Sequence, residues 1–360
     1  MPSYIETRTR IIALVAVGAS LAALLLRVGG AGGVAVFIAS AIGLAGLAAM
    51  VGEGTEQLSH RLGPKATGVL QSALGNLPEF FIGIFALRAG LLDVVRAALV
   101  GSILANTLLV LGLAFLAGGL RHGTQRFGTD QTKMMATLLL LAAAAIAIPT
   151  IATSPGGPAH GHGTELSVIV SVVLLVVFAA SIPFSIGKGQ SVGSVETVTV
   201  NEAIWPLPLA AAVLLVSAGS AAFVSDWFVE ALQPAMSTLG MSEAFAGLVV
   251  VAIAGNAVEN VVGVQAMLAN KGDLAVSVIL NSSLQVALVL VPVMVLISLL
   301  IGGATLTLVV SPLLVAALAL TAVLSAFIVV DGESTWLEGV ALIGLYVILA
   351  ASVWWGQPIG

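Results

Sequence analysis

The chain contains no cysteine among its 360 residues. Disulfide frameworks, thiolate zinc sites, iron–sulfur clusters and cysteine nucleophiles are therefore excluded. Charged residues are also scarce, at 8% of the chain, whereas soluble domains carry about 25%. The net charge of −5 is small and provides no basic surface for nucleic acid. This composition excludes a soluble domain and argues against a nucleic-acid partner.

Apolar residues, by contrast, make up 59% of the chain, and the mean hydropathy is +1.16. They form continuous stretches of about twenty residues, the length that an α-helix needs to cross about 30 Å of hydrocarbon. The shorter alternating segments typical of outer-membrane barrels are not the pattern here. We therefore expect an all-α integral membrane protein that is embedded in the lipid bilayer.

Charged residues and Gly- or Pro-rich breaks divide the chain into eleven predicted transmembrane helices. They cover residues 9–27, 32–58, 65–89, 93–119, 131–152, 165–187, 204–224, 244–270, 274–301, 305–330 and 335–355. Almost no chain remains for a soluble domain, and the sequence lacks the phosphate-binding motif G-x-x-x-x-G-K-[ST]. Transport would therefore use an ion gradient and not ATP, and no cofactor is expected.

Lys and Arg residues are unevenly divided between the two sides of the predicted membrane. With the N-terminus inside, nine fall in cytoplasmic segments and three, Arg27, Arg88 and Arg96, fall on the other side. This bias predicts a cytoplasmic N-terminus, and the odd number of spans places the C-terminus outside. We expect Arg88 and Arg96 to extend to the lipid interface. Short loops and an Ala-, Val- and Gly-rich composition favour a bacterial inner (plasma) membrane, with a vacuolar membrane as the alternative.

One stretch of sequence recurs 180 residues later. Residues 75–79 read Gly-Asn-Leu-Pro-Glu, and residues 255–259 read Gly-Asn-Ala-Val-Glu. The same offset pairs spans 2–6 with spans 7–11, and an odd number of spans per repeat requires opposite orientations in the membrane. The predicted parts are an N-terminal extra helix (1–31), a first five-helix repeat (32–187), a cytoplasmic linker (188–203) and a second five-helix repeat (204–360). In transporters with inverted repeats, the ion site lies near the midplane between the halves.

Two glutamates, Glu79 and Glu259, fall near the middle of their spans. A carboxylate at that depth costs roughly 2.5–3.5 kcal/mol to insert, so two in corresponding places require an explanation. One explanation is a protonated Glu that bonds to a neighbouring helix. The adjacent Gly75 and Gly255 favour a binding site instead, because they let the backbone approach closely or unwind. Two carboxylates neutralise one divalent cation and hold protons when it leaves, which is the basis of an antiport mechanism.

Neutral oxygen ligands accompany both glutamates, as hard cations such as Ca²⁺ require. Asn76 and Asn256 precede the two glutamates by three residues. The following helices add polar groups in otherwise apolar sequence, namely Ser102, Asn106, Asn281, Ser282, Ser283 and Gln285. For each single Ser or Asn, hydrogen bonding between helices is the alternative interpretation. Because the polar residues form facing clusters in the two repeats, we expect them to complete a cation site.

At these residues the chain resembles the cation/proton exchangers of the calcium/cation antiporter superfamily. The resemblance covers nearly the whole chain and is carried by Gly-Asn-x-x-Glu at 75–79 and 255–259, by residues 101–106 and by Ser-Ser-Leu-Gln at 282–285. It implies eleven helices, one extra and two inverted sets of five, and exchange of Ca²⁺ for H⁺. It also implies a metal site made by Glu79, Glu259, Asn76, Asn256, Ser102, Ser282 and Gln285.

The resemblance further implies that spans 2 and 7 gate the two mouths, with Glu56 and Asp226 as their polar residues. Asn106, Asn260 and Asn281 are further candidates for the gates or the ion path. The chain departs from the family at three positions. Asn260 replaces a His, Asn281 replaces a Gly before the paired Ser, and Asp226 replaces a Glu. These changes leave exchange of Na⁺ or K⁺ for H⁺, or of Na⁺ for Ca²⁺, as alternatives on the same scaffold.

Other classes of protein are disfavoured. A passive channel would need a polar pore-lining stripe, which the predicted spans lack. An intramembrane hydrolase would need a nucleophile–base pair or a metal-ligating set on the spans, and the sequence has neither. The expected partners are therefore the transported cations and the bilayer. The sequence does not determine the oligomeric state, and a homo-oligomer is compatible with it.

Asp93 and Asp273 begin spans 4 and 9, where we expect them to cap free N–H groups.

Overall fold

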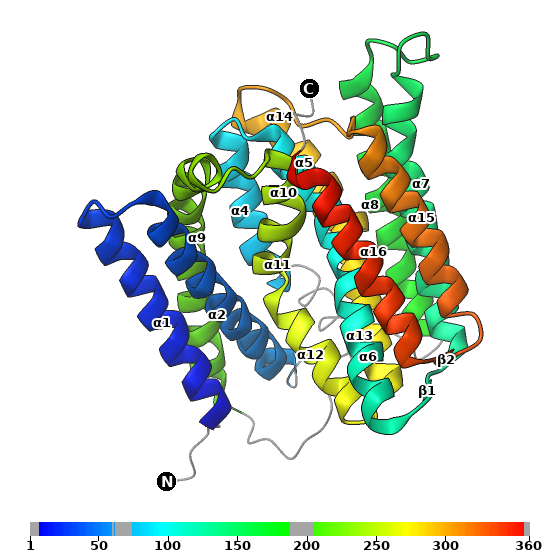
Figure 1. Ribbon diagram of the computed structural model, residues 1–360, viewed down its shortest axis with the longest axis horizontal. Coiled ribbons are helices and arrows are strands. Elements are labelled where there is room, and N and C mark those ends of the chain that lie inside the picture. The colour runs from blue at the N-terminus through cyan, green and yellow to red at the C-terminus, as the bar shows by residue number, and fades with distance from the viewer. Residues whose placement is uncertain (1–6, 60, 62–73, 188–204, 356–360) are drawn as a thin grey trace.

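The protein is described by a computed structural model over residues 7–59, 61, 74–187 and 205–355 (Figure 1). Within these residues, eight helices are long and apolar enough to cross a membrane, and two shorter apolar helices cover Glu243–Gly255 and Pro312–Ile328. The chain is thus an integral membrane protein of helical class, as predicted. The count of eleven spans stays a prediction, since much of the third predicted span lies outside the described residues.

The described elements follow the predicted spans closely. The helices are α1 (Thr7–Val28), α2 (Gly33–Ser59), α4 (Leu77–Arg88), α5 (Leu92–Leu104), α6 (Leu111–His122), α7 (Thr129–Ala152), α8 (Gly163–Gly187), α9 (Leu207–Leu239), α10 (Glu243–Phe245), α11 (Ala252–Gly255), α12 (Ala257–Leu268), α13 (Gly272–Gln285), α14 (Val291–Ile301), α15 (Pro312–Ile328) and α16 (Trp336–Trp354). Three π-helical segments, η1 (Ala105–Val110), η2 (Ala246–Val251) and η3 (Val286–Leu290), connect α5 to α6, α10 to α11, and α13 to α14. One span was predicted too short, because α9 continues fifteen residues past 224.

The helices α1, α2 and α9 form a group at one side of the molecule (Figure 1). Small residues allow close packing within this group. A Cβ on Gly46 of α2 would lie 2.8 Å from the Cα of Ala16 in α1, and one on Gly54 would lie 3.2 Å from the Cα of Leu214 in α9. The helix α4 connects the group to the main bundle by packing along α9.

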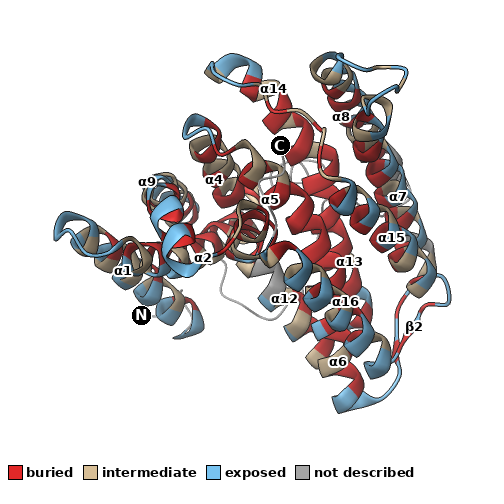
Figure 2. Cartoon of the chain, turned by 45° about the horizontal axis from the view of Figure 1, so that its top comes forward, coloured by how far each residue is buried: buried red, intermediate tan, exposed pale blue. Residues whose placement is uncertain are grey.

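The main bundle is built around α5 and α13, which are buried along most of their length (Figure 2). The outer helices expose large apolar side chains instead, including Leu25 of α1, Val176 of α8, Phe327 of α15 and Ile348 of α16. Such an outward apolar surface is expected where hydrocarbon and not water surrounds the protein.

Corresponding segments of the predicted repeats have matching backbones. The helices α4 and α12 contain twelve residues each and begin after an Asn at φ −97° and ψ 17° (Asn76) or φ −101° and ψ 22° (Asn256). The turns that follow them are left-handed at Gly90, with φ 76°, and at Asn270, with φ 59°. Asn270 is the only non-glycine residue with positive φ within the described chain. These matches support the interpretation of the sequence as a repeat.

The tenth predicted span begins with an extended segment and not with a helix. Residues 302–311 precede α15, and side chains from four helices bond to this segment. The backbone N–H groups of Leu306, Leu308 and Val310 donate to hydroxyls of Ser298, Ser167 and Thr150, at 2.9, 2.9 and 3.0 Å. These bonds satisfy backbone groups that a helix would have paired internally.

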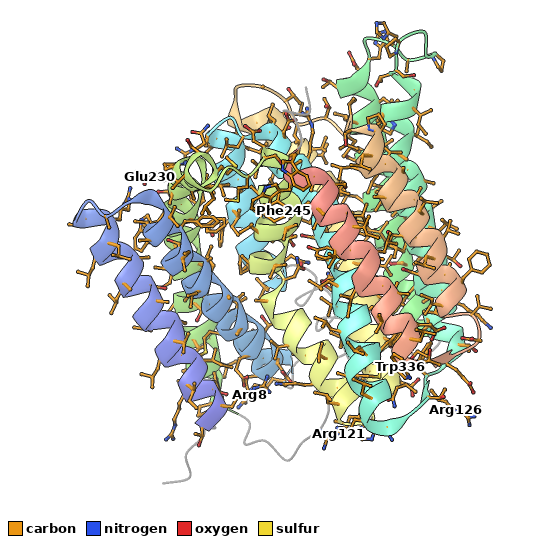
Figure 3. All side chains as sticks on the ribbon, viewed as in Figure 1. Arg8, Arg121, Arg126, Glu230, Phe245 and Trp336 are labelled. Atoms are coloured by element: carbon orange, nitrogen blue, oxygen red, sulfur yellow. The ribbon has the colours of Figure 1, made fainter. Side chains whose placement is uncertain are left out.

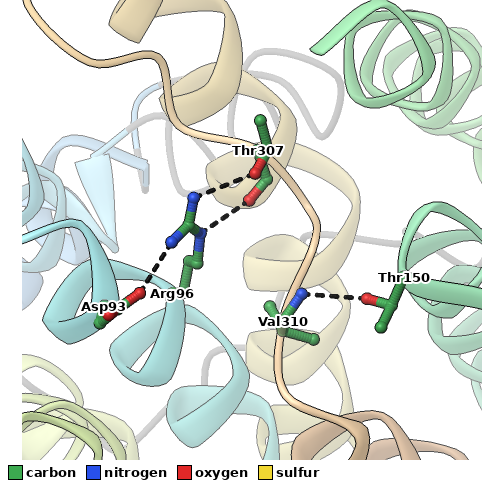
Figure 4. A network of polar contacts seen from close by, with 5 residues as sticks. All are labelled: Asp93, Arg96, Thr150, Thr307 and Val310. Carbon is green, nitrogen blue, oxygen red and sulfur yellow. Dashed lines mark hydrogen bonds and ion pairs between the residues drawn. The ribbon is translucent and has the colours of Figure 1, made fainter. Parts of the chain in front are cut away.

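Arg96 provides the fourth attachment and corrects the expectation that this side chain extends to the lipid interface. Its guanidinium donates to the carbonyl and hydroxyl oxygens of Thr307 at 3.2 and 3.0 Å, and to Asp93 at 2.7 Å (Figure 4). Asp93 and Asp273 lie in the first turns of α5 and α13, at the positive helix ends, as expected, but the N-cap residues are Leu91 and Lys271. The Asp273 carboxylate accepts a bond from the Gly128 N–H, outside its own helix.

A short ribbon connects the two halves of the chain at one end of the bundle. Strand β1 (Gln125–Arg126) pairs antiparallel with β2 (Glu333–Ser334), and Arg126 forms an ion pair with Glu333 at 3.0 Å. Arg8, Arg121 and Arg126 lie at this end, while Glu230 lies toward the opposite end (Figure 3). There Glu230 forms an ion pair with Arg27 at 2.6 Å. Each end of the bundle therefore carries an Arg–Glu ion pair, and the ribbon end carries Arg8 and Arg121 in addition.

Candidate functional site

The site is built where two helices begin in the interior of the bundle. Asn76 precedes α4 and Asn256 lies between α11 and α12, and both are buried. Neither Asn makes a side-chain cap to the helix that follows it. The first N–H groups of a helix have no partner inside it and carry partial positive charge. Glu79 lies in the first turn of α4, where this charge favours a carboxylate.

Glu79 is 4% exposed and is held by groups from both halves of the chain. Its Oε1 accepts hydrogen bonds from the Ser102 hydroxyl of α5 and from Nδ2 of Asn256, the latter at 3.2 Å. The Asn256 amide also donates to the Ser102 hydroxyl at 3.0 Å. Gly255 lies directly against the Glu79 side chain, because a Cβ there would be 3.2 Å from both Cβ and Cγ of Glu79. The glycine thus permits the close approach that the sequence predicted.

Asn106 extends this network to α13. Its Nδ2 donates to the Ser282 hydroxyl at 3.0 Å and to Oδ1 of Asn256 at 3.4 Å. The residue lies in η1, one turn beyond Ser102, and is fully buried. Among the described residues, no donor reaches Asn106 Oδ1. This amide oxygen is therefore a buried acceptor to which no described residue donates.

A second contact joins the two halves beside the first. Nδ2 of Asn76 donates to Oε1 of Gln285 at 3.3 Å, and both side chains are buried. One helical turn before Gln285, Asn281 is 3% exposed, and no donor in the described part of the chain bonds to its Oδ1. Six of the seven predicted ligands thus lie in two contacting sets across the halves, one around Glu79 and one at Asn76 and Gln285.

The remaining predicted residues are placed less directly. The side chains of Glu259 and Asn260 lie outside the described residues, although their backbone belongs to α12. Glu56 is half-buried on α2, and Asp226 is exposed in the middle of α9. The structure therefore describes the side chains of the first half of the predicted site more fully than those of the second, and the ligand roles stay predictions.

The chemistry of this set is that of an oxygen site with little charge. Within the described residues, no group of three or more His, Asp or Glu side chains could hold a metal ion. The interior offers a Glu carboxylate together with amide and hydroxyl oxygens. Neutral and carboxylate oxygens are the ligands that hard cations such as Ca²⁺ take, whereas Zn²⁺ and copper favour nitrogen or sulfur.

Comparisons with known proteins connect this geometry to ion exchange. A family model described as sodium/calcium exchanger protein matches residues 32–187 and 209–355. A Ca²⁺/H⁺ antiporter from Synechocystis sp. is 34% identical over 342 residues, which cover 89% of this chain and 91% of the relative. The Ca²⁺/H⁺ antiporter ChaA from Bacillus subtilis is 33% identical over 314 residues, which cover 84% and 87% of the two chains.

Solved structures agree with the fold. The structure of native YfkE has a TM-score of 0.82 and 28% sequence identity, and the match covers 95% of this chain and 99% of that one. A structure of an H⁺/Ca²⁺ exchanger, CAX, has a TM-score of 0.76 at 16% identity, covering 96% and 92%. At that lower identity the likeness concerns the fold alone.

Proposed function

Because the chain belongs to the sodium/calcium exchanger family, among its cation/proton exchangers, we propose that it moves Ca²⁺ across a membrane in exchange for H⁺. The observation that carries this proposal is the buried Glu79 carboxylate, which is bonded to Ser102 of its own half and to Asn256 of the other. A carboxylate placed between the halves binds either a cation or a proton. The names of the curated relatives favour Ca²⁺ over the monovalent alternatives.

Exchange follows from competition for the same oxygen atoms. Ca²⁺ binding requires the ionised carboxylate, whereas protonation removes the charge that makes the site attractive to the cation. Lowering the pH on one side therefore discharges Ca²⁺ from a site open to that side. The bonds from Ser102 and Asn256 keep Glu79 oriented while its occupant changes.

The second half contributes a corresponding carboxylate in this proposal. Glu259 follows Asn256 as Glu79 follows Asn76, and the matching turns at these two Asn residues support equivalent placement. Alternating access would expose the two glutamates to opposite sides in turn, through inverted halves and movement of α2 and α9. Glu56 and Asp226 would then line the approaches to the site.

The orientation proposed is N-terminus in the cytoplasm and C-terminus outside, in a bacterial plasma membrane. The three arginines at the ribbon end of the bundle support this assignment, because cytoplasmic ends are rich in Lys and Arg (Figure 3). In addition, α1 begins at that end and α16 ends at the opposite one (Figure 1).

The test is Ca²⁺ uptake by proteoliposomes under an imposed pH gradient, compared with Mn²⁺, Na⁺ and K⁺. We expect uptake by the wild type and a loss of at least about hundredfold in Glu79→Gln and in Glu259→Gln, because one carboxylate cannot balance a divalent ion. Glu165→Gln is the matched control, since this glutamate is exposed at the start of α8. Uptake that persists in both midplane variants, or that requires Na⁺ in place of the pH gradient, would overturn the proposal.

A further inference from the structure

Asn281 occupies a position where the two halves of the chain differ. The residue 180 positions earlier is Gly101. Gly101 lies at a crossing of α5 and η2 where a Cβ would be 2.5 Å from the Cα of Leu248, so no side chain fits there. The second half carries an amide at the corresponding place, and that amide is almost fully buried. The close packing that excludes a side chain at Gly101 therefore does not explain why the second half carries the Asn281 amide.

The buried oxygen of Asn281 has no donor among the described residues. An amide oxygen removed from water without a hydrogen bond is costly and rare in folded proteins. Six buried hydroxyl groups described here also lack partners, but they lie on α1, α2, α9, α15 and β2, which are not the elements that form the network around Glu79. Asn281 and Asn106 are the two amides with this property in the described chain, and Asn106 belongs to that network.

The position of Asn281 on its helix places it beside the same site. Ser282, the next residue, accepts the bond from Asn106. Gln285 lies four residues later, on the same face of the helix, and accepts the bond from Asn76. Asn281 thus adjoins both contacts that join the halves. Asn281 lies one helical turn before Gln285 on α13, and it is therefore the nearer of the two to the start of the helix.

We infer that Asn281 supplies a neutral oxygen ligand to the transported cation and thereby sets its affinity and selectivity. The inference rests on the proposed function, because it requires a cation site at Glu79. It goes beyond that proposal by assigning an asymmetric ligand. The first half contributes an amide at Asn106, whose counterpart in the second half is Val286, and the second half contributes Asn281, whose counterpart is Gly101. Amide oxygens favour cations that are readily stripped of water and add no charge.

Direct binding tests this assignment on the purified full chain in detergent, with Ca²⁺, Mn²⁺, Na⁺ and K⁺ as the probes. Asn281→Leu keeps a branched side chain and removes the oxygen, and we expect the Kd for the preferred cation to rise about tenfold. Asn281→Asp restores an oxygen and adds charge, so we expect it to bind Ca²⁺ at least as tightly as the wild type and to favour Ca²⁺ over Na⁺ more strongly. Ser171→Ala on α8 is the control, because this buried hydroxyl bonds to its own helix at Ser167, and the Kd should not change.

The outcomes separate this inference from the proposed function. If the wild type binds Ca²⁺ and Asn281→Leu binds it equally well, the ligand assignment is wrong while the proposed function stands. If the wild type prefers a monovalent cation and Asn281→Leu weakens that binding, the assignment stands and the Ca²⁺ proposal falls. Should Asn281→Leu fail to fold, equal Ca²⁺/Na⁺ preference in Asn281→Asp and wild type would overturn the assignment. Binding of none of the four cations by the wild type would overturn both.

Discussion

The polar residues of α5 and η1 can be compared with those of α13 and η3, because the two segments are 180 residues apart and have the same succession of helix, π-helix and helix. Ser102 and Ser282 correspond, and both join the central network. The other polar positions do not correspond. Similar backbones therefore carry different polar side chains, and matching helices do not imply a symmetric site.

The same contrast holds at the two breaks before the glutamates. Among the described residues, Asn76 makes one bond across the halves, to Gln285, whereas Asn256 bonds to Glu79, Ser102 and Asn106. The backbone conformations of the two Asn residues differ by only a few degrees. The neighbouring side chains, and not the local backbone, thus determine how much each Asn contributes.

Replacing Asn256 with Leu has the largest expected effect, and the same replacement at Asn76 is the comparison. Asn256→Leu removes a bond to a carboxylate and two neutral contacts, and hydrogen bonds to charged groups contribute about 1.5–3 kcal/mol. We expect Ca²⁺ uptake under a pH gradient to fall about hundredfold. Asn76→Leu removes one neutral bond, worth about 0.5–1.5 kcal/mol, and should cost tenfold or less. Equal losses in the two variants would mean that the two breaks are equivalent in function.

Adding a methyl group at Gly255 should have an intermediate effect. In Gly255→Ala the new Cβ would lie 3.2 Å from Glu79, whose carboxylate is already fixed by two donors. We expect an approximately tenfold loss of uptake, because small misplacements of a fixed ligand are costly. The matched control is Gly219→Ala on α9, where a Cβ meets nothing within 4 Å. It should retain full uptake and gain up to about 1 kcal/mol of stability from the better helix propensity of Ala. Comparable losses in the two variants would contradict the role given to Gly255.

The smallest expected effect concerns the left-handed turns. Asn270 adopts a φ of 59° where its counterpart is Gly90. Replacing Asn270 with Gly relieves strain in the folded state but increases the entropy of the unfolded chain, so the net gain should be about 0.5 kcal/mol or less. Gly90→Asn should lose a similar amount. Thermal unfolding of both variants measures the difference, and a large loss for Asn270→Gly would show that the Asn side chain itself holds the turn.

The sequence predicted most membrane spans because the apolar length of a helix is a local property. It failed for α9, where Ser225, Asp226 and Pro234 look like the end of a span but lie inside one helix. It also failed at 302–311, since the apolar residues there are as compatible with a helix as with an extended segment. The hydroxyls that select the extended form come from helices more than a hundred residues away in two of three cases.

The candidate site shows the same limit. The repeat at 75–79 and 255–259 indicated that Glu79 and Asn256 belong to one polar cluster, because polar groups at membrane depth need each other or an ion, and their role as cation ligands stays a prediction. It was not sufficient to predict that Asn106 bonds to Ser282, or that Gly255 rather than a side chain faces Glu79. These pairings depend on how α4, α5 and α13 cross, which is determined by packing over the whole bundle.

The extended segment at 302–311 also bears on the order in which the protein is made. Its partners Arg96, Thr150, Ser167 and Ser298 all precede it in the chain, so each has left the ribosome before Leu306 emerges. Unpaired backbone groups cannot remain among lipid tails. Synthesis from the N-terminus therefore produces every one of these hydrogen-bond partners before the segment that needs them.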